Sequence, residues 1–362
     1  MDNSDYNIKA TPELYDSFND EFITINKEKI PLAKDLTIVL GKVLETEKKI
    51  DGLTWLRNSN ENEQLQGVYI ISPYDPYKIP VVLVHGLMSE PRTWGKLLNI
   101  LLNNRKIREH YQFWIYAYPT GIPIPINAYR FRKSLEKMKE KYDPKGTNKQ
   151  FNDMVIIGHS MGGILSRLSV QSSNRTELLE NVLNAKIGEM KFTDAEKEEL
   201  IDIAVWEALP FVKRVILIAT PHRGSDMSLS WYSKLGAKFI KIPENIKNLS
   251  AKVIDKASRK NKQSTTYAIT GVGGLSPYNK FLKESVKMPI ANNVKIHSII
   301  GDTRGDNKKN GTDGVVPYWS SHLDSANSEV IIKSDHGAHM KHKATKEIIR
   351  ILNESAKRSW YE

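Results

Sequence analysis

Short runs of apolar, mostly β-branched residues alternate with helical segments from Val68 almost to the C-terminus. The pattern predicts strands over 67–72, 81–84, 113–118, 154–157, 215–219, 294–300 and 329–333. It predicts helices over 92–104, 126–141, 161–171 and 343–353. Strands and helices that alternate in this way form a mostly parallel sheet with helices on both faces. The sequence therefore predicts an α/β fold.

Three stretches fall outside this alternation. Residues 1–70 are expected to form an N-terminal extension, in which apolar residues at helical spacing predict one amphipathic helix: Leu32, Leu36, Val39, Leu40, Val43 and Leu44. The main domain is expected over 71–362, with a charged helical insertion at 176–211 and an aromatic, lysine-rich cap insertion at 225–293. In α/β folds such insertions usually lie above the carboxyl ends of the strands, where ligands bind.

Composition excludes several classes of function. The chain has no cysteine, which excludes a thiolate nucleophile, disulfides and cysteine-ligated metals. The net charge is 53 − 42 = +11, but lysine and glutamate interleave and no phosphate loop or RNA-binding motif accompanies them, so no nucleic-acid partner is expected. The polar start MDNSDYNIKA and the shortness of every apolar run predict no signal peptide or transmembrane segment in this chain. The compartment stays open, because a signal can be removed.

The strongest chemical signal is the run VIIGHSMGG at 155–163. It is a G-x-S-x-G motif between an apolar strand and a helix, the context in which that motif forms a sharp turn. Side chains at Gly158 and Gly162 would collide with the neighbouring backbone in such a turn. The turn presents the Ser160 hydroxyl at its tip, and we interpret Ser160 as a nucleophile.

A serine hydroxyl needs an adjacent base, and in chains with this turn the order is serine, acid, histidine. His336 is the preferred base, because it follows the expected strand 329–333 and precedes the last helix; His339 is the alternative. The other late histidines lie within or beside expected elements: His297, His322 and His342. The acid is expected after strand 294–300, where glycine-flanked Asp313 is preferred over Asp302 and Asp306. It would orient the histidine and stabilise the imidazolium.

The negative oxygen that forms during acyl transfer also needs donors, usually two backbone N–H groups. One is expected from Met161, which follows the nucleophile and begins a helix. The other is expected from Leu87, in the loop that follows strand 81–84. His85 in the same loop is interpreted as a brace for the loop.

These residues resemble the lipase- and esterase-like α/β-hydrolases of bacteria over about 75–355. The matching segments are VVLVHGL (81–87), YQFWIYAYPTG (111–121), GHSMGG (158–163), ATPHRGS (219–225), GTDGVVPYWSSHL (311–323) and SDHGAH (334–339). The resemblance implies the α/β-hydrolase fold, a Ser160–Asp313–His336 triad, and Leu87 and Met161 as oxyanion donors. The first 70 residues have no counterpart in the resemblance.

The expected function is hydrolysis of a small-molecule or lipid carboxylic ester through an acyl-enzyme at Ser160, with no cofactor. The same machinery can cleave thioesters or amides or transfer acyl groups, and a catalytically silent binding module is a further alternative. The cap either contacts a lipid surface or packs its aromatic residues inward. Oligomeric state is left open.

Overall fold

The structure is a computed structural model, and it describes residues 12–16, 20–32, 34–35, 51–173, 193–227, 271–305 and 310–359, with isolated positions 178, 180, 241, 243 and 244. Within these ranges a seven-stranded sheet has the order β3-β5-β4-β6-β7-β8-β9. β3 runs antiparallel to β5, and every other pair of neighbours is parallel. The strands are β3 (Gly67–Ile70), β4 (Ile79–Val84), β5 (Tyr111–Ala117), β6 (Met154–His159), β7 (Val212–Ile218), β8 (Lys295–Asp302) and β9 (Ser328–Lys333).

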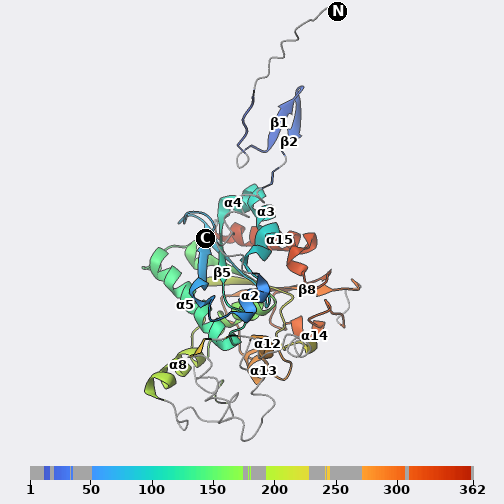
Figure 1. Ribbon diagram of the computed structural model, residues 1–362. Helices are drawn as coiled ribbons and strands as arrows, with labels where there is room; N and C mark the ends of the chain where they lie inside the picture. Colours follow the sequence, from blue (N-terminus) through green and yellow to red (C-terminus); the bar gives the residue numbers. More distant parts are fainter. Residues whose placement is uncertain are drawn as a thin grey trace, which may run out of the picture.

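Helices cover both faces of this sheet (Figure 1). The longer ones are α3 (Gly95–Asn103), α5 (Ile124–Tyr142), α6 (Met161–Leu168), α8 (Asp194–Ala204) and α15 (His342–Ser359). Shorter helices and 3₁₀ turns are α2 (Gly52–Arg57), η1 (Glu63–Leu65), η2 (Pro91–Trp94), α4 (Arg105–His110), η3 (Phe151–Asp153), α12 (Gly271–Gly274), α13 (Lys280–Ser285), α14 (Tyr318–Ser321) and η7 (Ala338–Met340). The α/β-hydrolase fold expected from the sequence is confirmed by this mostly parallel, doubly covered sheet.

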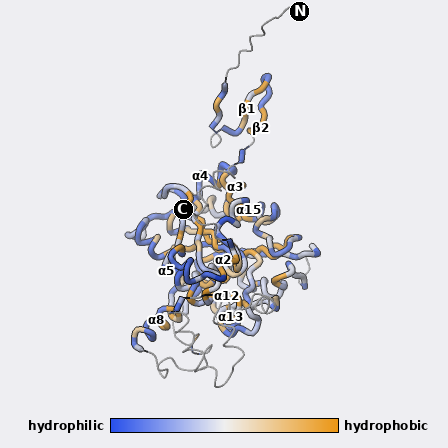
Figure 2. Tube along the Cα trace, in the orientation of Figure 1, coloured by the Kyte–Doolittle hydropathy of each residue, from blue (hydrophilic) through white to orange (hydrophobic). Residues whose placement is uncertain are grey.

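The apolar strands are explained by burial on both sides. Successive side chains of a strand point to opposite faces, so Val82 and Val84 join the core cluster that includes α5 and α6. Val81 and Leu83 join the other cluster, which includes α3, α4 and α15. Figure 2 shows the hydrophobic residues gathered along the central strands and hydrophilic ones on the outer helices. A strand buried on both faces must be apolar throughout, and this is why its sequence does not alternate.

All seven predicted strands are present, with ends shifted by a few residues. The segment predicted as one helix over 92–104 is instead the turn η2 followed by α3, and Asn104 then begins the separate helix α4. The Asn104 side chain accepts a hydrogen bond of 3.2 Å from the Ile107 N–H, so this residue caps a new helix. The helix predicted over 161–171 ends at Leu168.

The N-terminal region contains elements that sequence periodicity did not predict. A hairpin is formed by β1 (Phe22–Ile25) and β2 (Glu28–Pro31), and it lies beyond α3 and α4 in Figure 1. Helix α2 buries Trp55 and Leu56, and Leu56 belongs to the main core. The predicted amphipathic helix with Leu36–Leu44, most of the insertion before α8, and the cap over 228–240 and 245–270 lie outside the described residues.

Candidate active site

The three residues that the sequence singled out for the triad follow three parallel strands of the sheet. Ser160 comes directly after β6, Asp313 lies in the connection after β8, and His336 follows β9. Because β6, β7, β8 and β9 are parallel neighbours, their carboxyl ends lie at one edge of the sheet. Ligands of open α/β folds bind at this edge.

A chain of two hydrogen bonds joins these three side chains. His336 Nε2 lies 2.9 Å from Ser160 Oγ, and His336 Nδ1 lies 2.7 Å from Asp313 Oδ2. Ser160 is 5% exposed and Asp313 is 3% exposed. A serine, an imidazole and a buried carboxylate in this order form the arrangement that lets the imidazole remove the serine proton.

The turn at Ser160 is strained. Its backbone has φ +54° and ψ −125°, a conformation that non-glycine residues rarely adopt, and its N–H donates to the Ile218 carbonyl at 2.9 Å. A Cβ atom on Gly162 would lie 2.3 Å from the carbonyl oxygens of both Val84 and His85. Only glycine therefore allows α6 to pack this closely against the end of β4, and this contact holds the serine at the tip of the turn.

The loop after β8 fixes the Asp313 carboxylate. Its Oδ1 atom accepts hydrogen bonds from the backbone N–H groups of Val315 at 2.8 Å and Val316 at 2.6 Å. Oδ2 is thereby left to face His336. Because one oxygen is held by the backbone, the other has a defined direction toward the imidazole.

The alternative acids are placed differently. Asp302 ends β8 and is buried, but its Oδ1 accepts from the Arg304 N–H at 3.3 Å, and its Oδ2 contacts no polar partner among the described residues. Asp306 lies outside the described residues. Asp313 is thus the candidate acid that the structure places on His336.

The alternative bases also make other contacts. His339 Nε2 is hydrogen-bonded to Thr93 Oγ1 at 2.8 Å, and His297 contacts Arg214 and Ser328. His322 lies between Glu329 and Asp324, at 2.5 and 3.0 Å. His342 begins α15. No described histidine other than His336 is hydrogen-bonded to Ser160.

The two backbone donors proposed for the oxyanion lie beside the serine. Met161 is the first residue of α6, and a Cβ on Gly86, which precedes Leu87, would lie 2.8 Å from Ser160 Cβ. Among the described residues, neither the Leu87 N–H nor the Met161 N–H donates to another protein group.

Packing from the N-terminal region holds the loop that carries Leu87. The His85 ring stacks on Tyr118 with centroids 4.5 Å apart, and it meets the edge of Trp55 from α2 at 6.2 Å. Burial lowers the pKa of His85 to about 4, so the ring is neutral at pH 7. This placement agrees with the interpretation of His85 as a brace.

Sequence reasoning missed the role of His159. Its Nε2 donates to the backbone carbonyl of His336 at 2.8 Å, and its ring lies 4.0 Å from that of His339. Burial, and then the neighbouring His339 and His336, hold the pKa of His159 well below its usual range. A neutral His159 therefore ties the His336 loop to the turn. The sequence signal for this role was the position of His159 directly before the nucleophile. The apolar pattern assigns that position to the end of the strand.

The segment ATPHRGS connects the end of β7 to the loop that carries Asp313. The His222 N–H donates to the Ser320 carbonyl at 2.9 Å, and Arg223 donates to the carbonyl oxygens of Trp319 at 3.1 Å and His322 at 2.6 Å. These bonds join the segment after β7 to α14 and His322, and α14 begins two residues after Val316. The segment therefore supports the acid loop from outside the triad.

The described residues contain no group of three or more histidine, aspartate or glutamate side chains arranged to hold a metal ion. No helix in the described part of the chain combines the length and apolar character needed to cross a membrane.

No protein-family model matches this sequence, and no curated protein matches it. Solved structures are similar in fold. The mature lipase BlEst2 of Bacillus licheniformis is 17% identical, over 79% of this chain and 97% of that chain, with a TM-score of 0.45. EstA of Clostridium botulinum is 14% identical over 88% and 96%, with a TM-score of 0.44, and Staphylococcus hyicus lipase is 15% identical over 80% and 96%, with a TM-score of 0.42. Identities this low do not carry an activity over to this chain.

Proposed function

We propose that this protein is a serine-dependent carboxylic ester hydrolase in which Ser160 is the nucleophile. The observation that carries the proposal is the hydrogen-bond chain from Ser160 through His336 to Asp313, at 2.9 and 2.7 Å. A serine is too weakly acidic to attack an ester unaided, and an imidazole oriented by a buried carboxylate supplies the missing base.

In the proposed reaction His336 Nε2 takes the Ser160 proton while Oγ attacks the ester carbonyl carbon. The tetrahedral oxyanion accepts hydrogen bonds from the N–H groups of Leu87 and Met161. The C–O bond to the alcohol then breaks, and His336 returns its proton to the leaving oxygen. Water, activated by the same imidazole, hydrolyses the acyl-enzyme and releases a carboxylic acid. Asp313 stabilises the imidazolium in both halves of the reaction.

The same residues would also act on thioesters or amides, or transfer the acyl group to an alcohol, so the test must include these substrates. We expect a fluorophosphonate probe to label the wild-type protein at Ser160, as shown by mass spectrometry of the labelled peptide. We expect a series of nitrophenyl esters from short to long acyl chains to be hydrolysed, and the best chain length to define the acyl pocket. Absence of labelling, together with no turnover of any ester, thioester or amide, would support a silent binding module instead.

Among the late histidines, His336→Ala is expected to lose nearly all turnover, while His339→Ala keeps most of it. The reason is contact: His336 is hydrogen-bonded to Ser160, whereas His339 is bonded to Thr93. Steady-state kcat and KM on a nitrophenyl ester measure the difference. His339 is buried, so circular dichroism and thermal unfolding of both variants are the control for folding. An active His336→Ala and an inactive His339→Ala would reassign the base.

A further inference from the structure

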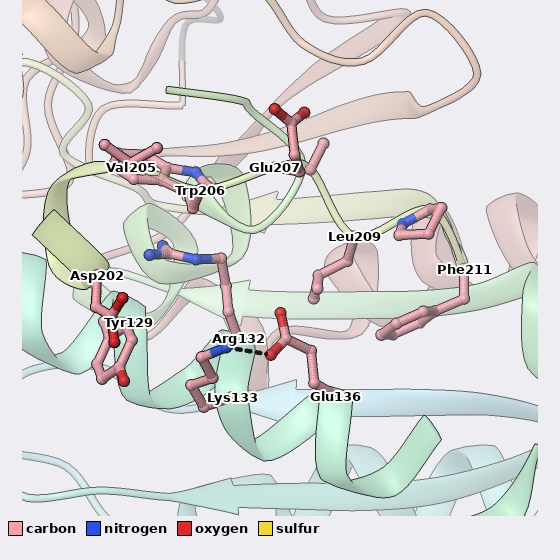
Figure 3. Close-up of a pocket in the computed structure, with 12 residues that line it drawn as sticks. Tyr129, Arg132, Lys133, Glu136, Asp202, Val205, Trp206, Glu207, Leu209 and Phe211 are labelled. Atoms are coloured by element: carbon pink, nitrogen blue, oxygen red, sulfur yellow. Dashed lines mark ion pairs between the residues drawn. The ribbon is translucent and has the colours of Figure 1, made fainter. Parts of the chain in front are cut away.

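A cavity of about 260 Å³ lies between α5, α8 and the segment 205–211 (Figure 3). It shares no lining residue with the Ser160 site. Its volume is slightly below the range of about 300–1,000 Å³ that is usual for drug-sized ligands. The cavity therefore has room for a small molecule.

The wall of this cavity contains a buried arginine without a counter-ion. Arg132 on α5 is 3% exposed, and its guanidinium carbon lies 4.4 Å from the centre of the Trp206 ring. Among the described residues, its Nη2 atom has no hydrogen-bond partner and no carboxylate forms an ion pair with it, although the charge of Glu136 attracts it. The nearby Glu136 is instead paired with Lys133, at 2.8 Å, as Figure 3 shows.

Burial makes this arrangement costly. A cation that leaves water loses its hydration free energy. Only a paired anion or full hydrogen bonding compensates for that loss. Burial lowers the pKa of Arg132 to about 10, so the guanidinium stays protonated at pH 7. The aromatic face of Trp206 compensates in part, because cations are attracted to the ring. Among the described residues, the Nη2 group of the guanidinium stays without a hydrogen-bond partner.

The other residues that line the cavity favour some anionic ligands over others. Trp206, Leu209 and Phe211 give the cavity an apolar wall, and Figure 3 shows Asp202 on the other side of the guanidinium. Glu207 adds a second carboxylate, and Glu136, which is paired with Lys133, adds a third. These negative charges disfavour a dianion such as phosphate more than a monoanion, because like charges repel. A single carboxylate, by contrast, matches the two-donor edge of a guanidinium.

We propose that this cavity is a binding site for a small apolar monocarboxylate, with its carboxylate on Arg132 and its apolar body against Trp206, Leu209 and Phe211. The site is separate from the ester hydrolase site, and the proposal does not depend on the proposed function.

The test is isothermal titration of the full-length protein with 3-phenylpropionate as the probe. We expect saturable binding, and in Arg132→Gln we expect a loss of affinity on the order of tenfold or more, the effect of losing a charge-assisted hydrogen bond. The matched control is Lys137→Gln, on the same helix, because Lys137 is exposed and does not line the cavity. This control is expected to bind like wild type. Phenethylamine, which replaces the carboxylate by an ammonium, and inorganic phosphate are expected to bind more weakly than the probe.

Three further measurements keep the result interpretable. Ala208→Leu should fill the cavity while leaving Arg132 in place, and it is expected to weaken binding even if Arg132→Gln were to misfold. Thermal unfolding should show that the probe raises the Tm of wild type and not that of Arg132→Gln. Ester turnover of Arg132→Gln is expected to match wild type, which separates this cavity from binding of the probe at Ser160. Absence of saturable binding, equal affinity in Arg132→Gln, or tighter binding of phosphate or phenethylamine would overturn the proposal.

Discussion

The Ser160→Ala protein is expected to hydrolyse esters about a million-fold more slowly than wild type, the loss measured when the nucleophile of a comparable serine enzyme is removed. No other group takes over, because His336 Nε2 is aimed at the Ser160 oxygen and would face a methyl group in the variant. Single-turnover and steady-state rates on an activated nitrophenyl ester would measure the loss.

The fold of Ser160→Ala is expected to stay intact, because alanine keeps the Cβ atom and the backbone hydrogen bond to Ile218. A matched control is Ser169→Ala, which removes another buried hydroxyl just beyond α6, where Ser169 Oγ donates to the Ser166 carbonyl at 2.7 Å. This control is expected to keep turnover. Wild-type-like rates in Ser160→Ala would end the nucleophile assignment, and continued labelling by the fluorophosphonate would point to a different serine.

Asp313→Asn is expected to lower turnover by about four orders of magnitude, as in the serine-protease template. The amide oxygen can still accept from the N–H groups of Val315 and Val316. The amide NH₂ then replaces Oδ2 in front of His336 Nδ1. Facing a donor, the imidazole would place its proton on Nε2, and it could no longer accept the proton of Ser160.

Asp302→Asn is the matched control for that substitution, since Asp302 is a second buried carboxylate at the end of β8 that makes no contact with His336. Its turnover is expected to stay near that of wild type. A pH–rate profile of each protein would show whether the loss follows the protonation of the base. The opposite outcome, an inactive Asp302→Asn and an active Asp313→Asn, would move the acid to the end of the strand.

The choice between these two aspartates shows a limit of sequence reasoning. Both follow the same strand and both are buried in the structure. Which carboxylate meets His336 depends on the path of the chain after β8, where the N–H groups of Val315 and Val316 hold Asp313. Flanking glycines favour the correct residue, but they do not specify the direction of its side chain.

The N-terminal region shows a second limit. Trp55 contacts the ring of His85, and a Cβ on Gly52 would lie 1.9 Å from the Met88 carbonyl oxygen, so α2 packs directly on the loop after β4. Nothing in the sequence of residues 51–57 indicates this role. These contacts join residues thirty or more positions apart, and local periodicity does not report on such pairs. The pairing of the buried Arg132 with Trp206 escaped notice for the same reason.

By itself the sequence determined the features that depend on local pattern and on burial. Uninterrupted apolar runs specify strands covered on both faces, and the glycines around Ser160 specify a turn that places it at the end of β6. Only the tertiary structure decided which acid faces the base, that His159 holds the base's loop, and that α2 supports the loop with Leu87. The physical reason is that these are long-range contacts between side chains, and their geometry exists only once the parallel strands have brought their carboxyl ends to one edge of the sheet.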